Sequence, residues 1–139
     1  MIRRYHHTQL TRTTPALDAS AVALLADDLS PAQALEFLSI FTSLLDTRIT
    51  EIAQALTHQP DQNTPETPAA HEPLDVLLNL RAGSAMIGAR RIELLTATAL
   101  TDRRTGNITP EPLIRELKAE ARRFTLAATR LHHPSAYAA

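Results

Sequence analysis

The residues best suited to chemistry in this chain are its six histidines, and their spacing gives little support for a site. His6 and His7 are adjacent, so their side chains cannot face the same way on a helix or a strand, and no carboxylate lies close in sequence. His132 and His133 stand at the end of a predicted helix, where cations are favoured. A zinc-binding His-Glu-x-x-His pattern is absent. The sequence therefore predicts no metal and no cofactor.

Other catalytic arrangements are also missing. The three glycines, Gly83, Gly88 and Gly106, do not form a phosphate-binding loop, and there is no cysteine to act as a nucleophile or a metal ligand. Asp27 and Asp28 are neighbouring carboxylates, but adjacent side chains diverge on a helix, so we expect them to be solvated at a helix end. The chain is predicted not to be an enzyme.

Composition indicates a single helical domain. Of the 139 residues, 44% are hydrophobic and only 4% are aromatic, a mixture that favours helices over sheets. The formal net charge of −1 gives no case for nucleic acid. No apolar run is long enough to cross a membrane, and the first residues lack the apolar core of a secretory signal. We therefore expect a cytoplasmic protein with no membrane contact.

The first half of the chain predicts a short helix followed by a long one. Residues 1–16 are polar and are expected to form a flexible tail, and the folded part should run from 17 to 133. Asp18 can cap a helix that starts at Ala19 and ends near Leu29. Ser30, Pro31 and Gln33 are a helix start, and apolar residues then recur every three or four positions to about residue 58. This stripe consists of Leu38, Phe41, Leu45, Ile49, Ile52 and Leu56.

The second half predicts two further long helices. Residues 59–73 contain four prolines and form a loop. Residues 74–100 then carry one apolar stripe and are expected to be one continuous helix, followed by a loop over 101–108. The last helix begins at Pro110, and residues 134–139 form a tail. The stripes are Leu74, Leu77, Leu80, Ile87, Leu94 and Leu95 in the first of these helices, and Ile114, Leu117, Ala121, Phe124, Ala128 and Leu131 in the last.

These elements predict an all-α antiparallel bundle built from one short N-terminal helix and three long helices. One feature of the 74–100 segment needs a further reason. Gly83 and Gly88 lie among other small residues, and glycine inside a helix costs about 1 kcal/mol relative to alanine. Such a segment is expected where another backbone approaches closely, either from a neighbouring helix or from a partner.

The residue order from Leu80 to Ala89, Leu-Arg-Ala-Gly-Ser-Ala-Met-Ile-Gly-Ala, resembles the central helix of histidine phosphotransfer (HPt) domains. That motif reads His-x-Leu-Lys/Arg-Gly-Ser-Ser/Ala-x-x-Leu-Gly-Ala. Leu80 and Arg81 match the Leu-Lys/Arg pair. At the position of the phosphoryl-accepting histidine this chain has Leu78, and shifting the alignment by one residue places Asn79 there.

The resemblance implies an HPt-like bundle that has lost its phosphoacceptor, because leucine carries no nucleophile. In an HPt domain a receiver domain docks over the histidine, and nearby Lys or Arg side chains hold the phosphate. The resemblance therefore implies a pseudo-HPt of a two-component phosphorelay that binds a response-regulator receiver domain or a histidine kinase. On one continuous helix, Leu78, Ala82, Ala85 and Ala89 would share a face. The implied docking residues are Leu78, Arg81, Ala82, Gly83, Ala85 and Ala89.

Two alternatives remain open at the level of sequence. The small residues could instead allow helices to pack closely, within the bundle or across a homodimer, in a structural protein without signalling activity. A different histidine could also accept a phosphoryl group. His71 lies seven residues before Leu78 and would share its helix face, but Pro73 interrupts the helix between them, and His58 stands at a helix end.

Overall fold

The computed structural model describes residues 14–57 and 73–132, and within these ranges the chain forms helices and no strand. This confirms the predicted all-α class. His6, His7, His58, His71 and His133 lie outside the described residues, as do the C-terminal tail and most of the N-terminal tail and the 59–73 loop that the sequence predicted. The helices are α2 (Ala19–Asp28), α3 (Pro31–Thr57), α4 (Pro73–Ile87), α5 (Arg90–Arg104) and α6 (Pro110–His132).

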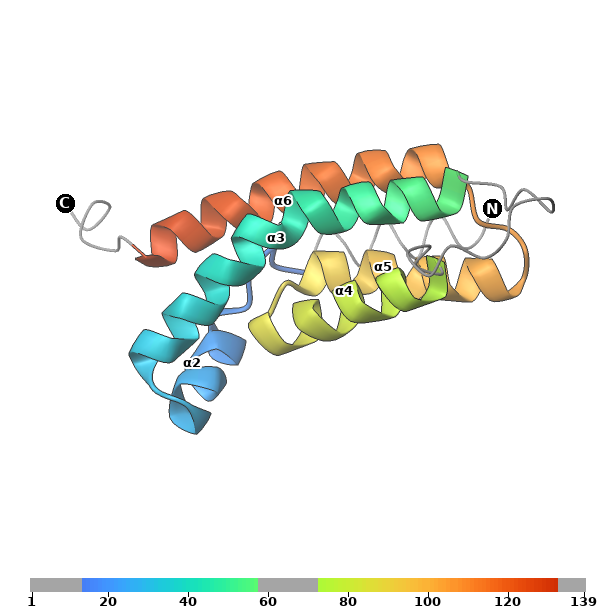
Figure 1. The fold of residues 1–139 in the computed structure, drawn as a ribbon. Helices are drawn as coiled ribbons and strands as arrows, with labels where there is room; N and C mark the ends of the chain where they lie inside the picture. Colours follow the sequence, from blue (N-terminus) through green and yellow to red (C-terminus); the bar gives the residue numbers. More distant parts are fainter. Residues whose placement is uncertain (1–13, 58–72, 133–139) are drawn as a thin grey trace, which may run out of the picture.

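Helices α3 to α6 form a four-sided bundle in which each helix runs antiparallel to its neighbours (Figure 1). Going around the bundle, α3 packs on α4, α4 on α5, α5 on α6, and α6 returns to α3. The short α2 lies against α3 and α4. Among the described residues, no helix combines the length and the apolar character needed to cross a bilayer.

The helix starts in the first half are where the sequence predicted them. The Asp18 side chain accepts a hydrogen bond of 3.1 Å from the amide of Ser20, which caps α2. The hydroxyl of Ser30 accepts a hydrogen bond of 3.0 Å from the amide of Gln33 at the start of α3. Both caps satisfy amides that the first turn of a helix leaves without partners.

The core lies on the axis of the bundle, where the predicted stripes of α3 and α6 meet. Each fully buried leucine or isoleucine contributes about 1.5–3 kcal/mol relative to an exposed one. The rings of Phe41 on α3 and Phe124 on α6 meet edge to face, with 5.3 Å between their centroids and 77° between their planes. The fully buried side chains of these two helices include Leu38, Leu45, Ile49, Ile52, Leu117 and Phe124.

The predicted continuous helix over 74–100 is wrong. The chain turns back at Gly88 and Ala89, so α4 and α5 form an antiparallel helical hairpin. The bundle is therefore built from the four helices α3 to α6, with the short α2 packed against it. Gly88 has a φ of +83°, a left-handed conformation that glycine adopts without steric cost and that ends a helix. Helix α5 also continues to Arg104, into the segment predicted as a loop.

The turn at Gly88 is held by the start of α2. The amide of Asp18 donates a hydrogen bond of 2.8 Å to the carbonyl oxygen of Gly88. A Cβ atom on Gly88 would lie 2.6 Å from the carbonyl oxygen of Asp18 and 2.9 Å from the Cβ of Ala21. Gly88 is therefore required twice, for its backbone conformation and for the close approach of α2.

A buried charge cluster joins α5 to α6. Glu120 on α6 is 6% exposed, and one of its carboxylate oxygens lies 2.6 Å from Nη1 of Arg123. The other oxygen lies 3.1 Å from Nε of Arg91 on α5, although these two atoms are not aligned as a hydrogen bond. A buried carboxylate is costly unless it is paired, so the contact of Glu120 with Arg91 links α6 to α5.

Candidate functional site: the exposed face of α4

Leu78 lies on the outer surface of the bundle. Its side chain is 44% exposed, whereas Leu77 and Leu80 on the same helix are 0% and 2% exposed. Arg81 and Ala82 are also exposed. The structure thus brings together Leu78, Arg81 and Ala82 on one exposed face, because residues three and four apart are neighbours on a helix.

The remaining predicted docking residues lie deeper. A Cβ atom on Gly83 would come within 3.2 Å of Cε2 of Phe41, so Gly83 allows α3 to pack closely on α4. Ala85 is half-buried, and its carbonyl oxygen accepts a hydrogen bond from Arg90. Ala89 is fully buried in the turn after α4. The expectation that Ala89 shares a face with Leu78 is wrong, because that expectation required one continuous helix.

Two further apolar residues extend the exposed face. Leu74 was predicted to be buried, but it is 38% exposed, and Met86 is 54% exposed. Together with Leu78 and Ala82 they form a row with a spacing of four residues, which we call the α4 ridge (Leu74, Leu78, Ala82 and Met86). This regular spacing was the sequence signal for Met86, because residues four apart follow one side of a helix.

The chemistry available on the α4 ridge is recognition and not group transfer. Leucine, alanine and methionine provide apolar contact, and Leu78 has no atom that can attack phosphorus. Arg81 stands beside the ridge and forms no ion pair with any other residue that the structure describes. Its guanidinium can therefore pair with a carboxylate or a phosphate of a partner.

A polar cluster beside the turn has a structural explanation. Nε of Arg90 donates to the Asp18 carboxylate over 3.2 Å, and Nη1 of Arg90 donates to Glu93 over 3.2 Å. The hydrogen bond from the Ser20 side chain, followed by the contacts with Arg90 and the Ser20 amide, lowers the pKa of Asp18 below its ordinary value, although partial desolvation opposes this. These contacts hold α2, α4 and α5 together, so each charge of the cluster already has a structural role.

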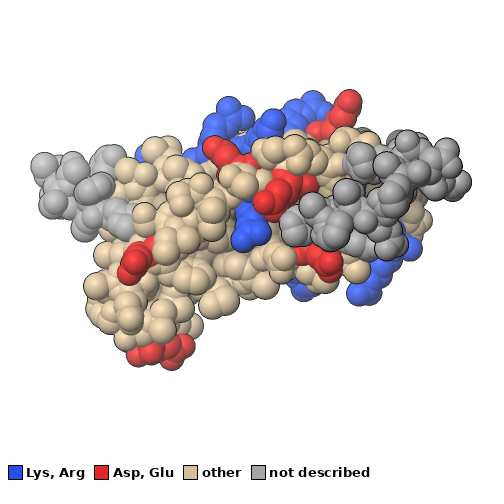
Figure 2. Space-filling view, viewed as in Figure 1, with Lys and Arg blue, Asp and Glu red and all other residues tan. Residues whose placement is uncertain are grey.

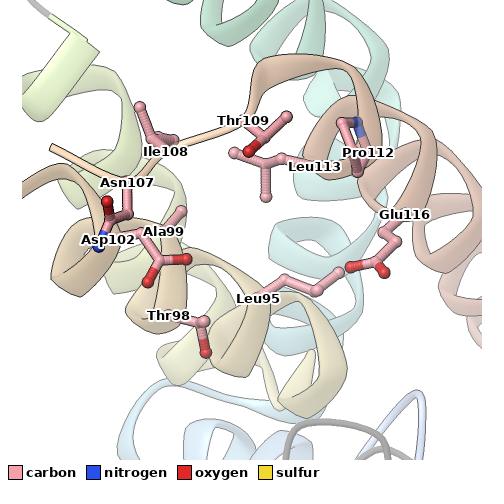
Figure 3. Close-up of a pocket in the computed structure, with 10 residues that line it drawn as sticks. All are labelled: Leu95, Thr98, Ala99, Asp102, Asn107, Ile108, Thr109, Pro112, Leu113 and Glu116. Carbon is pink, nitrogen blue, oxygen red and sulfur yellow. The ribbon is translucent and has the colours of Figure 1, made fainter. Parts of the chain in front are cut away.

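A hollow of about 240 Å³ lies between α5 and α6, near the connection that joins them (Figure 3). Its hydroxyl groups belong to Thr98 and Thr109, and no histidine that could activate them is among the residues labelled in the figure. Its two carboxylates, Asp102 and Glu116, both interact with other groups. The apolar side chains that line it are Leu95, Ala99, Ile108, Pro112 and Leu113.

No group of histidines and carboxylates that could hold a metal ion occurs in residues 14–57 and 73–132. Comparison of the chain with protein-family models, with curated proteins and with solved structures finds no match. The exposed face of α4 is thus the candidate site, and it is defined by its geometry, which brings Leu78, Arg81 and Ala82 together.

Proposed function

We propose that this protein is a pseudo-HPt that docks a receiver domain or a histidine kinase of a two-component phosphorelay through the α4 ridge and Arg81. In this role it relays no phosphoryl group through α4. It acts by occupying its partner, as a competitor, an adaptor or a scaffold.

The observation that carries the proposal is the exposure of Leu78 at the position where the motif has its phosphoacceptor. The fold accounts for the buried or packed residues of the motif, which are Leu80 and Ile87 in the core, Gly83 against Phe41, and Gly88 in the turn. It gives no packing role to the side chains of Leu78 and Arg81, which are both exposed. An exposed leucine beside an arginine that has no ion pair among the described residues offers a partner both apolar contact and a guanidinium that can pair with an anion.

The first experiment is a calorimetric titration of the full chain with purified receiver domains from the same organism. We expect micromolar binding to at least one receiver and at least about tenfold weaker binding after Leu78→Asp, because a carboxylate would have to be desolvated in the interface. Leu24→Asp is the matched control, since Leu24 is 66% exposed on α2, outside the ridge. Equal effects of the two substitutions would contradict docking at α4.

A second experiment restores the missing nucleophile. In Leu78→His, an imidazole nitrogen would attack the phosphorus of the receiver's aspartyl phosphate, forming the N–P bond and releasing the aspartate carboxylate. We expect the radiolabelled phosphoryl group to move to the variant and not to the wild-type chain. Transfer should be lost again in Leu78→His combined with Arg81→Gln. No transfer from a receiver that binds the wild-type chain would mean that docking does not place this residue at the phosphoaspartate.

The exposed apolar ridge also supports a second candidate function, a homodimer that buries α4 against a second copy. Sedimentation equilibrium of the wild-type chain and of Leu78→Asp separates the two. A dimer that the substitution dissociates, together with no receiver binding, would favour the structural role. The remaining alternative, phosphorylation at His71, is tested by incubating the wild-type chain and His71→Gln with a phosphorylated receiver.

A further inference from the structure

The outer face of α6 carries a row of cations that is independent of the α4 ridge. Arg115, Lys118 and Arg122 are all exposed, and their spacing of three and four residues places them on one side of the helix. One turn further on, Leu126 is 53% exposed. In Figure 2, Lys and Arg side chains gather along the upper edge, over α6, with some Asp and Glu side chains beside them, whereas the surface over α2 and the first half of α3 carries no Lys or Arg. We call Arg115, Lys118, Arg122 and Leu126 the α6 basic row.

The charges of this row are not neutralised within the described part of the protein. Arg48, Arg90, Arg91 and Arg123 each have a carboxylate within ion-pair distance. Within residues 14–57 and 73–132, no such contact is made by the three cations of the row. Arg123 on the same helix is by contrast paired with Glu120, whereas Arg81 on α4 shares with the row the lack of an ion pair to any described residue.

The two like-charge pairs of the row, Arg115 with Lys118 and Lys118 with Arg122, are unfavourable for the isolated helix. The exposed Glu111, four residues before Arg115, offsets part of this repulsion. Like charges three or four residues apart repel each other by a few tenths of a kcal/mol for each pair. The helix dipole offers no compensation to Arg115, because it favours cations only in the last turn and Arg115 lies in the second turn of α6. A ligand with the opposite charge would relieve this repulsion.

We propose that the α6 basic row binds an acidic protein segment whose carboxylates pair with Arg115, Lys118 and Arg122 and whose apolar side chain packs on Leu126. Arginine supports this choice because its planar guanidinium pairs with carboxylates through two parallel hydrogen bonds. The exposed leucine favours a protein over a nucleic acid, as does the absence of any aromatic side chain from the row on which a base could stack. The net charge of −1 for the whole chain points the same way.

This site goes beyond the proposed function because it lies on a different helix. Helix α6 packs on α3 and α5, and so does α4, so the two helices occupy opposite sides of the bundle. An acidic segment on α6 therefore leaves the α4 ridge open. The protein would then hold two partners at once, which is the property of a scaffold.

The test uses the full 139-residue chain and a labelled helical peptide that presents glutamates and one leucine on a single face. Binding is followed by fluorescence anisotropy at low salt. We expect Arg115→Gln/Arg122→Gln to weaken binding at least about tenfold and Leu126→Ser to weaken it several-fold. The matched control is Arg103→Gln/Arg104→Gln, which removes the same charge from the last turn of α5 and should change the affinity less than about twofold. Thermal unfolding shows whether each variant is folded.

Loss of peptide binding in the α6 variants alone supports the proposal. Equal losses in the two double variants would reduce it to non-specific charge attraction and overturn it, and so would a failure of the wild-type chain to bind the peptide. A single-stranded DNA of the same charge is the second probe, and tighter binding of DNA than of peptide would assign the row to nucleic acid and overturn the proposal. None of these outcomes depends on receiver binding at α4.

Discussion

The amide of Asp18 donates a hydrogen bond to the carbonyl oxygen of Gly88, over 2.8 Å, and so joins the start of α2 to the turn between α4 and α5. The two residues are far apart in the sequence, and their contact attaches α2 to the bundle. The side chain of Asp18 strengthens the same junction, because it accepts a hydrogen bond from Arg90, the first residue of α5. One short segment therefore carries both a backbone and a side-chain contact to the turn.

Gly88→Ala should destabilise the protein by roughly 2 kcal/mol or more, because alanine is strained at positive φ and its Cβ would collide with the backbone of Asp18. Gly106→Ala is the control. Gly106 also has a positive φ, of +74°, but a Cβ there would meet nothing within 4 Å, so only the backbone strain of about 1 kcal/mol remains. Urea unfolding of both variants measures the difference. Equal losses would mean that the contact with α2 adds nothing.

Asp18→Asn tests the charge of the same junction, because asparagine caps helices as well as aspartate does. The folded-state pKa of Asp18 lies below its ordinary value of 3.8, chiefly through its hydrogen bond with Ser20. The charged carboxylate therefore stabilises the fold above that ordinary value, and this contribution disappears as the pH falls through the lowered pKa. We expect Asp18→Asn to be less stable than the wild type near neutral pH and equal to it in strong acid.

Urea midpoints of the wild type and of Asp18→Asn, measured across that pH range, provide the test. A double-mutant cycle with Arg90→Gln measures how strongly Asp18 and Arg90 are coupled. In the Arg90→Gln background, Asp18→Asn should have a smaller effect, because one of the partners of the carboxylate has already been removed. A pH-independent difference between wild type and Asp18→Asn would contradict the assigned direction of the pKa shift.

Leu77 and Leu78 are adjacent in sequence but differ in burial, and their alanine variants should differ accordingly. Leu77→Ala removes a fully buried side chain and should cost about 2–5 kcal/mol of unfolding free energy. Leu78→Ala should cost less than about 1 kcal/mol, because its side chain is 44% exposed. Thermal and urea unfolding measure both. A large loss at Leu78 would place it in the packing of the monomer and remove the basis for docking.

Glu120→Gln should destabilise the bundle by roughly 2–4 kcal/mol, because it leaves Arg91 without its carboxylate between α5 and α6. Arg123→Gln should cost less than about 1 kcal/mol, since the Arg123 side chain is 57% exposed and water can replace its partner. The comparison uses urea unfolding at moderate salt. Similar losses for the two variants would indicate that the buried contact with Arg91 contributes little.

The first half of the fold could be predicted from the sequence because its signals are local. Asp18, Ser30 and Pro31 mark helix starts by their own chemistry, and the spacing of apolar residues in α3 continues without a change of phase. The start of α6 at Pro110 was readable for the same reason. In each case neighbouring residues determine the conformation.

The turn at Gly88 was not predicted because α4 and α5 bury their apolar faces against the same core. Apolar residues therefore recur across the turn and imitate one helix. The available signal was a phase change, since the buried residues Ile87 and Ile92 are five positions apart, whereas one helix face repeats every three or four. The contact of Gly88 with Asp18 depends on the tertiary fold and cannot be read from local sequence.

The candidate site was predictable only where it depends on a single helix. The neighbours Leu78, Arg81 and Ala82 lie within one turn of α4, so their common exposure follows from helical spacing alone. The burial of Ala89 depends on where α4 ends, and the packing of Gly83 depends on Phe41 of α3. Both are tertiary relationships that local spacing does not reveal. The sequence-based prediction therefore placed Gly83 and Ala89 on the docking face.

The aromatic content of the core has a spectroscopic consequence. The chain has no tryptophan, and its two tyrosines, Tyr5 and Tyr137, lie outside the described residues. The described core has only phenylalanines as aromatic residues, and these emit very little fluorescence, so changes at the contact between Phe41 and Phe124 would be nearly invisible in emission. A single tryptophan placed at Leu78 or at Leu126 would be the only strong emitter in the molecule, and its spectrum would report events at that one surface without interference from the rest of the protein.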